Sequence, residues 1–289
     1  MNILVTGVSG FIGSALFDHL LEPRETGSRV FGTAREANRE FIYKADLESK
    51  ASVDGMIAEC STSGITFECI VHCATVLATT ENAHDISLLT QNLKITENTI
   101  YLAKALGVTN VINLSTIGVY PNADGIYNEL SAVRPSANAE GLYGLAKLAS
   151  ENLFDFFLAT TGVSVTNLRL SQVYGDGMRN DRIMKIMEEE MLKDKKITVW
   201  GNGERVSNFV DVDTVVSTIR QFIKYPMPGI FNVGGENLSY LQLAQKVIAI
   251  CGKKDIDIIL LDKGIKSKVY IDSSKLQNVL HPSDEDTFS

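Results

Sequence analysis

The first fourteen residues constrain the fold more than any other stretch of the chain. An apolar run at 3–5 meets three glycines, and an apolar pattern of helical period follows at 14–21. A strand that turns into a helix through glycines predicts the first βαβ unit of a parallel sheet. Such a turn exposes backbone N–H groups, which bind a pyrophosphate with the help of the helix dipole; a tight turn without a ligand is the alternative. The candidate cofactor residues here are Gly7, Gly10, Phe11, Ile12 and Gly13.

Strands and helices alternate along the next hundred residues. After a polar loop at 22–28, runs typical of strands lie at 29–32, 41–46, 69–75 and 111–116, and helical patterns lie at 51–60 and 86–106, the last ending at Gly107. This alternation predicts an α/β fold with a doubly wound parallel sheet, whose ligands bind beyond the carboxyl ends of the strands. Along that edge we expect the glycine turn, Arg35, Asp46, Ala74 and Thr116.

The end of the second predicted strand indicates which dinucleotide fits. In such a fold an acidic side chain at this place binds the ribose 2′-hydroxyl of NAD, whereas an arginine accommodates the 2′-phosphate of NADP. Thr33 stands where the acid would be, and Arg35 follows it. Glu36 comes next, so NAD stays an alternative. We expect a dinucleotide cofactor, with NADP favoured over NAD.

Three further residues, Asp46, Leu47 and Ala74, are candidates to touch that cofactor. Asp46, followed by Leu47, ends the third predicted strand and can face the adenine. Its other role is to cap a helix in the polar segment from Glu48, and the two roles are compatible. Ala74, at the end of the fourth predicted strand, is small enough for close passage of a cofactor.

Composition argues against several kinds of partner. The chain has 289 residues and a formal net charge of −8, whereas nucleic acids and anionic membranes need surfaces dense in Lys and Arg. No apolar run approaches the ~20 residues of a membrane span, and no signal peptide is indicated before the first strand. We therefore expect a cytoplasmic protein without nucleic-acid or membrane partners.

The cysteines and histidines offer no metal site. The four cysteines show no paired framework and are interpreted as reduced core residues. The four histidines lack the spacing of metal ligands, and His72 is interpreted as a packed strand residue. We expect no metal.

Tyr143 and Lys147 lie four residues apart at the start of a predicted helix, which puts them on one face. The spacing is common by chance, but here it follows the glycine turn and the hydroxyl pair Ser115-Thr116. A phenol titrates at about pH 10, so a neighbouring ammonium brings it closer to its working range. Tyr143 can then exchange a proton with a carbonyl or alcohol while a nicotinamide moves the hydride, and Thr116 can orient the same oxygen. The alternative is an exposed pair on a solvated helix face.

The chain resembles, over nearly its whole length, the extended short-chain dehydrogenases/reductases, the family of nucleotide-sugar epimerases, dehydratases and reductases. The resemblance implies a Rossmann-type sheet, with Thr116, Tyr143 and Lys147 as the catalytic residues and Lys147 also holding the nicotinamide ribose. The matching segments, in family order, are Thr6–Ser14, Cys69–Thr75, Val111–Pro121, Tyr143–Glu151, Asn167–Gly175, Val199–Val212 and Ile230–Gly235.

The resemblance also implies a smaller C-terminal domain that grips the nucleoside diphosphate of a sugar substrate. We expect a dinucleotide-binding domain over 1–170, to which 209–233 returns. The substrate-binding domain then comprises 171–208 and 234–289.

Substrate-side positions depart from the family. Gln172 stands where an Asn is usual, and Ser207 where an Arg often contacts the pyrophosphate. Arg205, two residues earlier, can take over that contact. The candidate substrate-binding residues are therefore Thr116, Gln172 and Arg205.

Ile117 and Gly118 narrow the reaction. In the family's dehydratases the catalytic Thr is followed by an Asp-Glu pair, which supplies the acid and base for eliminating water. Ile117 and Gly118 occupy those two positions here, and neither can transfer a proton. We expect an NAD(P)-dependent oxidoreductase, favoured as an NADPH-dependent reductase of a nucleotide-linked 4-keto-6-deoxy sugar. A nucleotide-sugar 4-epimerase with tightly bound NAD is the alternative, and a non-catalytic dinucleotide sensor is the third interpretation. The sequence leaves the identity of the sugar and of the nucleotide open. It also leaves the oligomeric state open, since the helices at 86–106 and 145–158 either form a homodimer interface or only cover the sheet.

Overall fold

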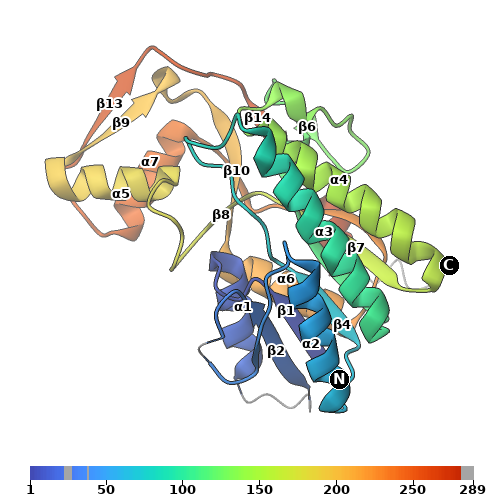
Figure 1. Cartoon of the computed structure of the whole chain (residues 1–289). Helices are drawn as coiled ribbons and strands as arrows, with labels where there is room; N and C mark the ends of the chain where they lie inside the picture. The colour runs from blue at the N-terminus through green and yellow to red at the C-terminus, as the bar shows by residue number, and fades with distance from the viewer. Residues whose placement is uncertain (23–27, 38, 281–289) are drawn as a thin grey trace. The chain divides into compact units, whose positions relative to one another are not determined.

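The computed structural model describes residues 1–22, 28–37 and 39–280, coloured along the chain in Figure 1. The chain divides into two compact units, each built from several segments. The first unit comprises Met1–Pro121, Val133–Arg169 and Asp213–Phe231, and the second comprises Asn122–Ala132, Leu170–Val212 and the residues from Asn232 onward. The predicted loop at 22–28 lies mostly outside the described residues, as does the end of the chain.

A large sheet forms the centre of the first unit. Its strand order is β11-β7-β5-β4-β1-β2-β3, and the pairs from β5 to β3 are parallel. The order reverses at β1, which pairs with β2 on one side and β4 on the other, as a doubly wound sheet requires. The predicted α/β fold is confirmed. The strands are β1 (Asn2–Thr6), β2 (Arg29–Ala34), β3 (Ile42–Lys44), β4 (Cys69–His72), β5 (Asn110–Thr116), β7 (Ser164–Leu170) and β11 (Gly229–Val233).

Helices pack against this sheet, with α3 and α4 side by side (Figure 1). The predicted limits of α3 are confirmed, because Asp85 caps its first turn by accepting the Ser87 N–H, and Gly107 ends it in the left-handed conformation at φ 65°. The helices are α1 (Phe11–Leu21), α2 (Lys50–Thr62), α3 (Ile86–Leu106), α4 (Gly141–Leu158) and α6 (Val212–Lys224), with short 3₁₀ turns η1 (Ile117–Val119), η2 (Pro135–Ala137) and η3 (Ala159–Thr161).

The core of the first unit lies between the sheet and α2, α3 and α4. Strand residues such as Leu4 and Val111 pack there with Leu102 of α3 and Phe154 of α4, all fully buried. Truncating one such side chain to Ala costs about 2–5 kcal/mol. This packing fixes α4, which carries Tyr143 and Lys147, against the sheet.

Two predicted strands are shorter than expected. The strand expected at 41–46 extends only over β3, because Phe41 has a positive φ of 63° and the chain turns after Lys44. The strand expected at 69–75 ends at His72, because the hydroxyl of Thr6 takes the N–H groups of Cys73 and Ala74, each at 3.1 Å. Asp46 and Ala74 therefore lie in turns beyond the strand ends.

The second unit has its own small sheets. Strand β10 pairs with β8 and β12, β9 pairs with β13, and β14 pairs with β6. The last pairing brings 122–132 into this unit, although the sequence analysis left that segment in the larger domain. The strands are β6 (Gly125–Tyr127), β8 (Gln172–Tyr174), β9 (Lys196–Trp200), β10 (Val206–Asp211), β12 (Glu236–Ser239), β13 (Asp257–Leu261) and β14 (Val269–Ile271).

Helices α5 and α7 close the core of the second unit. Met184, Met187 and Met191 of α5 pack there with Leu243 and Val247 of α7. A capping box between Ser239 and Gln242 begins α7. The helices are α5 (Ile183–Asp194), α7 (Tyr240–Ile250), α8 (Ser274–Leu280) and the 3₁₀ turn η4 (Gly201–Gly203). The assignment of substrate binding to this unit stays a prediction.

Candidate functional site

The glycine turn after β1 is packed too tightly for other residues. Gly7 has φ +69°, and a Cβ on it would lie 2.7 Å from Cα of Ala74. A Cβ on Gly13 would lie 2.3 Å from the carbonyl oxygen of Gly7. Both residues must therefore be glycine.

The N-terminus of α1 fits an anion. Gly10 is its N-cap, no side chain caps the helix, and its first turn carries no acidic residue. The N–H groups of Phe11 and Ile12, in the first helical turn, have no carbonyl partner within the helix. A pyrophosphate would satisfy these donors and the positive end of the helix dipole. The cofactor role of the turn stays a prediction that this geometry fits.

Thr6 shapes the neighbouring strand end, and the sequence analysis missed it. Its Oγ1 accepts the N–H groups of Cys73 and Ala74 and lies 3.1 Å from Nδ1 of His72. Burial lowers the pKa of His72 to about 3, so its ring is neutral and can accept the Thr6 hydroxyl proton. His72 is a packed strand residue, as predicted, and Ala74 lies against Gly7 at the turn.

The loop after β2 is exposed and charged. Arg35 is exposed directly beyond the strand, whereas Thr33 is buried. Glu36 accepts from Lys44 at 3.1 Å, and Arg39 forms an ion pair with Asp18 at 2.8 Å. Glu36, the acidic residue that kept NAD as an alternative, thus forms an ion pair with Lys44.

Asp46 serves a turn between β3 and α2. Its Oδ1 accepts the N–H of Glu48 at 3.0 Å, and its own N–H donates to Ser52 Oγ at 2.9 Å. The N-cap of α2 is Ser49, so the helix-cap role predicted for Asp46 is wrong by three residues. Leu47 is buried, and its carbonyl accepts from Asn98 at 2.7 Å. The contacts of Asp46 and Leu47 with a cofactor stay predictions.

Thr116 ends β5 and begins η1. Its Oγ1 accepts the N–H of Gly118 at 3.1 Å. This bond uses one lone pair of the hydroxyl and directs it, while the hydroxyl proton can serve as a donor to another oxygen. The side chain is therefore oriented by its own backbone before any ligand binds.

The side chain of Lys147 extends from α4 to β5 and is buried. Its ammonium donates to the carbonyl oxygen of Leu114 at 2.8 Å and lies 5.8 Å from the ring centroid of Tyr143. Desolvation lowers the pKa of Lys147 to about 8, partly offset by Cys73 and Glu151. The predicted pair is thus joined on one helix face, and its lysine is buried, so the interpretation as a solvated surface pair is wrong.

Gly144 lets α4 touch η1. A Cβ on Gly144 would lie 2.4 Å from the carbonyl oxygen of Gly118. Glycine at this place therefore brings the helix start, with Tyr143, against the turn that follows Thr116. The start of α4 and η1 therefore lie together beyond the end of β5.

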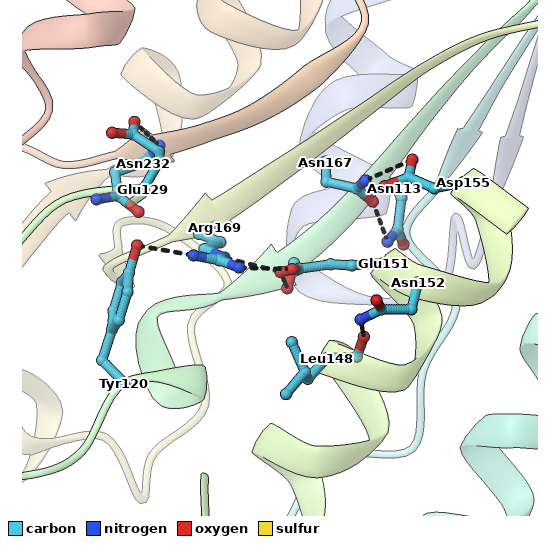
Figure 2. A network of polar contacts seen from close by, with 11 residues as sticks. Asn113, Tyr120, Glu129, Leu148, Glu151, Asn152, Asp155, Asn167, Arg169 and Asn232 are labelled. Atoms are coloured by element: carbon cyan, nitrogen blue, oxygen red, sulfur yellow. Dashed lines mark hydrogen bonds and ion pairs between the residues drawn. The ribbon is translucent and has the colours of Figure 1, made fainter. Parts of the chain in front are cut away.

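A buried polar network lies behind these residues, and the sequence analysis missed it (Figure 2). Glu151 of α4 receives two hydrogen bonds from Arg169 of β7, at 3.0 and 2.7 Å, and one from the Ser115 hydroxyl. Arg169 also donates to the Tyr120 hydroxyl at 2.9 Å. The signal in the sequence is the place of Glu151, four residues after Lys147 and so on the same helix face.

The predicted substrate residues of the second unit make contacts of their own. The amide of Gln172 donates to Ser207 Oγ at 2.8 Å, so the two departures from the family pattern are joined by a hydrogen bond. Arg205 lies over the ring of Tyr240, 4.9 Å from its centroid. Their substrate roles stay predictions. Across the described residues, no group of three or more His, Cys, Asp or Glu side chains could hold a metal ion, and no helix is long and apolar enough to cross a membrane.

Comparisons with known proteins show which chains this one resembles. An uncharacterized UDP-glucose epimerase, YtcB, from Bacillus subtilis (strain 168) is 24% identical, covering 97% of this chain and 92% of the relative. A dTDP-4-dehydro-6-deoxy-D-allose reductase from Streptomyces sp is 26% identical, covering 88% of this chain and 82% of the relative. The crystal structure of UDP-glucose 4-epimerase with UDP-glucose from Thermotoga maritima superposes with a TM-score of 0.79 at 25% identity, covering 96% and 92% of the two chains.

The family assignment follows from a match over most of the chain. The family model described as the NAD dependent epimerase/dehydratase family matches residues 3–234. That span contains the glycine turn, Thr116, Tyr143 and Lys147. The chain therefore belongs to the NAD dependent epimerase/dehydratase family.

Proposed function

We propose that the protein is an NADPH-dependent reductase of a nucleotide-linked 4-keto-6-deoxy sugar. The observation that carries this proposal is the end of β2, where Thr33 is buried in the strand, Arg35 is exposed just beyond it and Glu36 is paired with Lys44. A guanidinium at this place suits the 2′-phosphate of NADP. Two reductases of dTDP-4-dehydro-6-deoxy sugars, from Streptomyces sp and Escherichia coli, are among the relatives at 26% and 25% identity.

The dinucleotide would be held by the N–H groups of the glycine turn, by Arg35 and by Lys147, and bound there it would supply the hydride. Asp46, Leu47 and Ala74 line the same edge of the sheet. The Tyr143 phenol donates the proton that the reduced carbonyl oxygen needs, and Lys147 stabilises the phenolate left behind. Thr116 donates a hydrogen bond to that oxygen and fixes its orientation.

Dehydration does not suit this site. Ile117 and Gly118, the residues of η1 after Thr116, carry no group that transfers a proton. A 4-keto sugar must then be supplied by another enzyme that eliminates water. The second unit, with Gln172 and Arg205, would bind the nucleoside diphosphate of that sugar. We assign the reaction to the cytoplasm, where NADPH is available.

A nucleotide-sugar 4-epimerase with tightly bound NAD is the second candidate. The similarity to the UDP-glucose 4-epimerase of Thermotoga maritima favours it. An epimerase reduces its own keto intermediate and gains from a cofactor that never leaves. A non-catalytic sensor is the third candidate. The presence of Thr116, Tyr143 and Lys147 together in the chain argues against it, because a sensor needs no proton relay.

One assay separates these candidates. The purified protein is incubated with NADPH and dTDP-4-dehydro-6-deoxyglucose, and with UDP-glucose in parallel. Stoichiometric loss of NADPH absorbance with the keto sugar supports the reductase. Conversion of UDP-glucose to its 4-epimer without net nicotinamide change would replace it with the epimerase. No turnover of either sugar, with NADPH bound, would favour the sensor.

The exposed aromatic residues of α3 and α4 suit a homodimer. Tyr101 of α3 and Phe156 and Phe157 of α4 are exposed on helices that lie side by side. A second copy packing on these helices would cover them. Sedimentation of the protein at several concentrations tests this arrangement, and a monomer at every concentration would contradict it.

A further inference from the structure

Both ends of the segment that carries Thr116 are bound by one buried ion pair. Ser115, the residue before Thr116, donates its hydroxyl to Glu151. Tyr120, the residue after η1, accepts from Arg169 through its hydroxyl at 2.9 Å. Glu151 and Arg169 hold each other through two hydrogen bonds, and Figure 2 shows this pair with the bond from Arg169 to Tyr120. With Ser115, the four residues form one chain of contacts around 116–119.

The same pair is tied to the helix that carries the candidate acid. Glu151 lies on α4, one turn after Lys147 and two turns after Tyr143, so its backbone moves with theirs. Lys147 adds a parallel link, from its ammonium to the carbonyl of Leu114. The distance between the Thr116 hydroxyl and the Tyr143 phenol is therefore set through these links across β5 and α4.

Burial of the ion pair restricts the geometry that its partners can adopt. Glu151 is 1% exposed and Arg169 is 3% exposed. A buried ion pair in this state adds little net stability against apolar replacements, but its partners hold strict geometry because an unsatisfied charge there is costly. A hydroxyl that orients a substrate oxygen, as proposed for Thr116, needs such fixed geometry. Misplacing it by about 1 Å can lower the rate about 10²-fold.

We propose that Glu151 and Arg169 are positioning residues, which hold Ser115 and Tyr120 so that the Thr116 hydroxyl and the Tyr143 phenol meet the same substrate oxygen. The proposal rests on the proposed function, in which both groups contact that oxygen. It assigns no contact with substrate or cofactor to Glu151 or Arg169 themselves. Their effect on the reaction passes through Thr116.

Two mild variants test the proposal without removing the charges. Ser115→Ala cuts the link to Glu151, and Tyr120→Phe cuts the link to Arg169. Each should lower kcat roughly 10- to 100-fold and leave KM for NADPH within about twofold. The matched control is Ser150→Ala, which removes a buried hydroxyl that joins α4 to Asn113 of β5 without touching 115–120, and which should leave kcat within about twofold.

A double-mutant cycle with Thr116→Val separates positioning from general damage. If the pair acts through Thr116, adding Ser115→Ala or Tyr120→Phe to Thr116→Val lowers kcat by less than about twofold more. Full additivity of the losses would overturn the proposal. Turnover is followed with dTDP-4-dehydro-6-deoxyglucose and NADPH, or with UDP-glucose if that sugar turns over instead. If Thr116→Val and Tyr143→Phe both keep full turnover, the proposed function fails, which is a different result.

A measurement without substrate covers the case in which neither sugar reacts. The N–H groups of Gly118 and Tyr120 are bonded to Thr116 Oγ1 and to the Ile117 carbonyl. Their hydrogen exchange should accelerate about tenfold or more in Ser115→Ala and Tyr120→Phe and stay unchanged in Ser150→Ala. Unchanged exchange in all three variants would also overturn the proposal.

Discussion

Two polar regions of the first unit lie at the same edge of one sheet and are built in opposite ways. Around Thr116 the charged groups are buried, and the side chains of Glu151 and Arg169 are 2% and 4% exposed. After β2 the charged groups face solvent, and the side chains of Lys44 and Glu36 are 66% and 80% exposed. The contrast is what the proposed function would require, with fixed geometry around the proposed catalytic residues and adaptable charged groups where the cofactor is proposed to be selected.

The strongest way to sharpen this contrast is Tyr143→Phe. The variant removes only a phenol oxygen, so turnover should fall on the order of 10²–10⁴-fold, as expected for a lost proton donor. NADPH affinity should stay within about twofold because the proposed ribose contact belongs to Lys147. Steady-state kinetics and a fluorescence titration measure the two effects. Near-normal turnover on a reacting sugar would reject Tyr143 as the acid.

Arg169→Met tests the buried region through its effect on the free energy of unfolding. It leaves the Glu151 carboxylate buried without its main partner, which should cost about 3–5 kcal/mol in the free energy of unfolding. Urea unfolding followed by circular dichroism gives this value. A loss below about 1 kcal/mol would mean that water or another cation reaches Glu151, contrary to its burial.

Arg35→Ala tests the exposed region through the relative affinities for NADPH and NADH. Loss of a charge-assisted phosphate contact should weaken NADPH by roughly 1.5–3 kcal/mol and leave NADH nearly unchanged. Isothermal titration with both cofactors measures the difference. Equal weakening of the two would remove the reason for favouring NADP.

Lys44→Ala should have the smallest effect. The ion pair of Lys44 with Glu36 is exposed, so its loss should change the free energy of unfolding by about 0–1 kcal/mol. Urea unfolding beside Arg169→Met gives a direct comparison of an exposed and a buried pair. Similar losses in the two variants would contradict the contrast between the regions.

Local signals in the sequence were enough for much of the fold. Helix α3 was predicted with both ends, because Asp85 and Gly107 act within one turn of it. The glycine turn and the joined Tyr143 and Lys147 were also predictable, since each depends on a spacing of three or four residues. The alternation of strands and helices then sufficed for the parallel sheet.

Features that depend on distant partners could not be predicted. Strand β4 ends early because of Thr6, whose hydroxyl binds the N–H of Cys73 from 67 residues away in sequence. The partner of Glu151 is Arg169, on a strand beyond the end of α4, and no periodicity reports such a pair. Asn122–Ala132 joins the second unit through the pairing of β6 with β14 and through hydrogen bonds such as that from Asn232 N to Glu129, about a hundred residues apart in sequence.

The order of strands in the large sheet has a consequence for synthesis on the ribosome. Strand β7 ends at Leu170, but its outer neighbour β11 begins only at Gly229, after the chain has built much of the second unit. At about 5–20 residues per second, β7 waits for several seconds as an open edge strand. The unpaired N–H and C=O groups of an open edge strand can pair with another chain. A nascent or shortened chain that stops before β11 therefore exposes an edge that the complete sheet covers, and we expect it to aggregate more readily than the full chain.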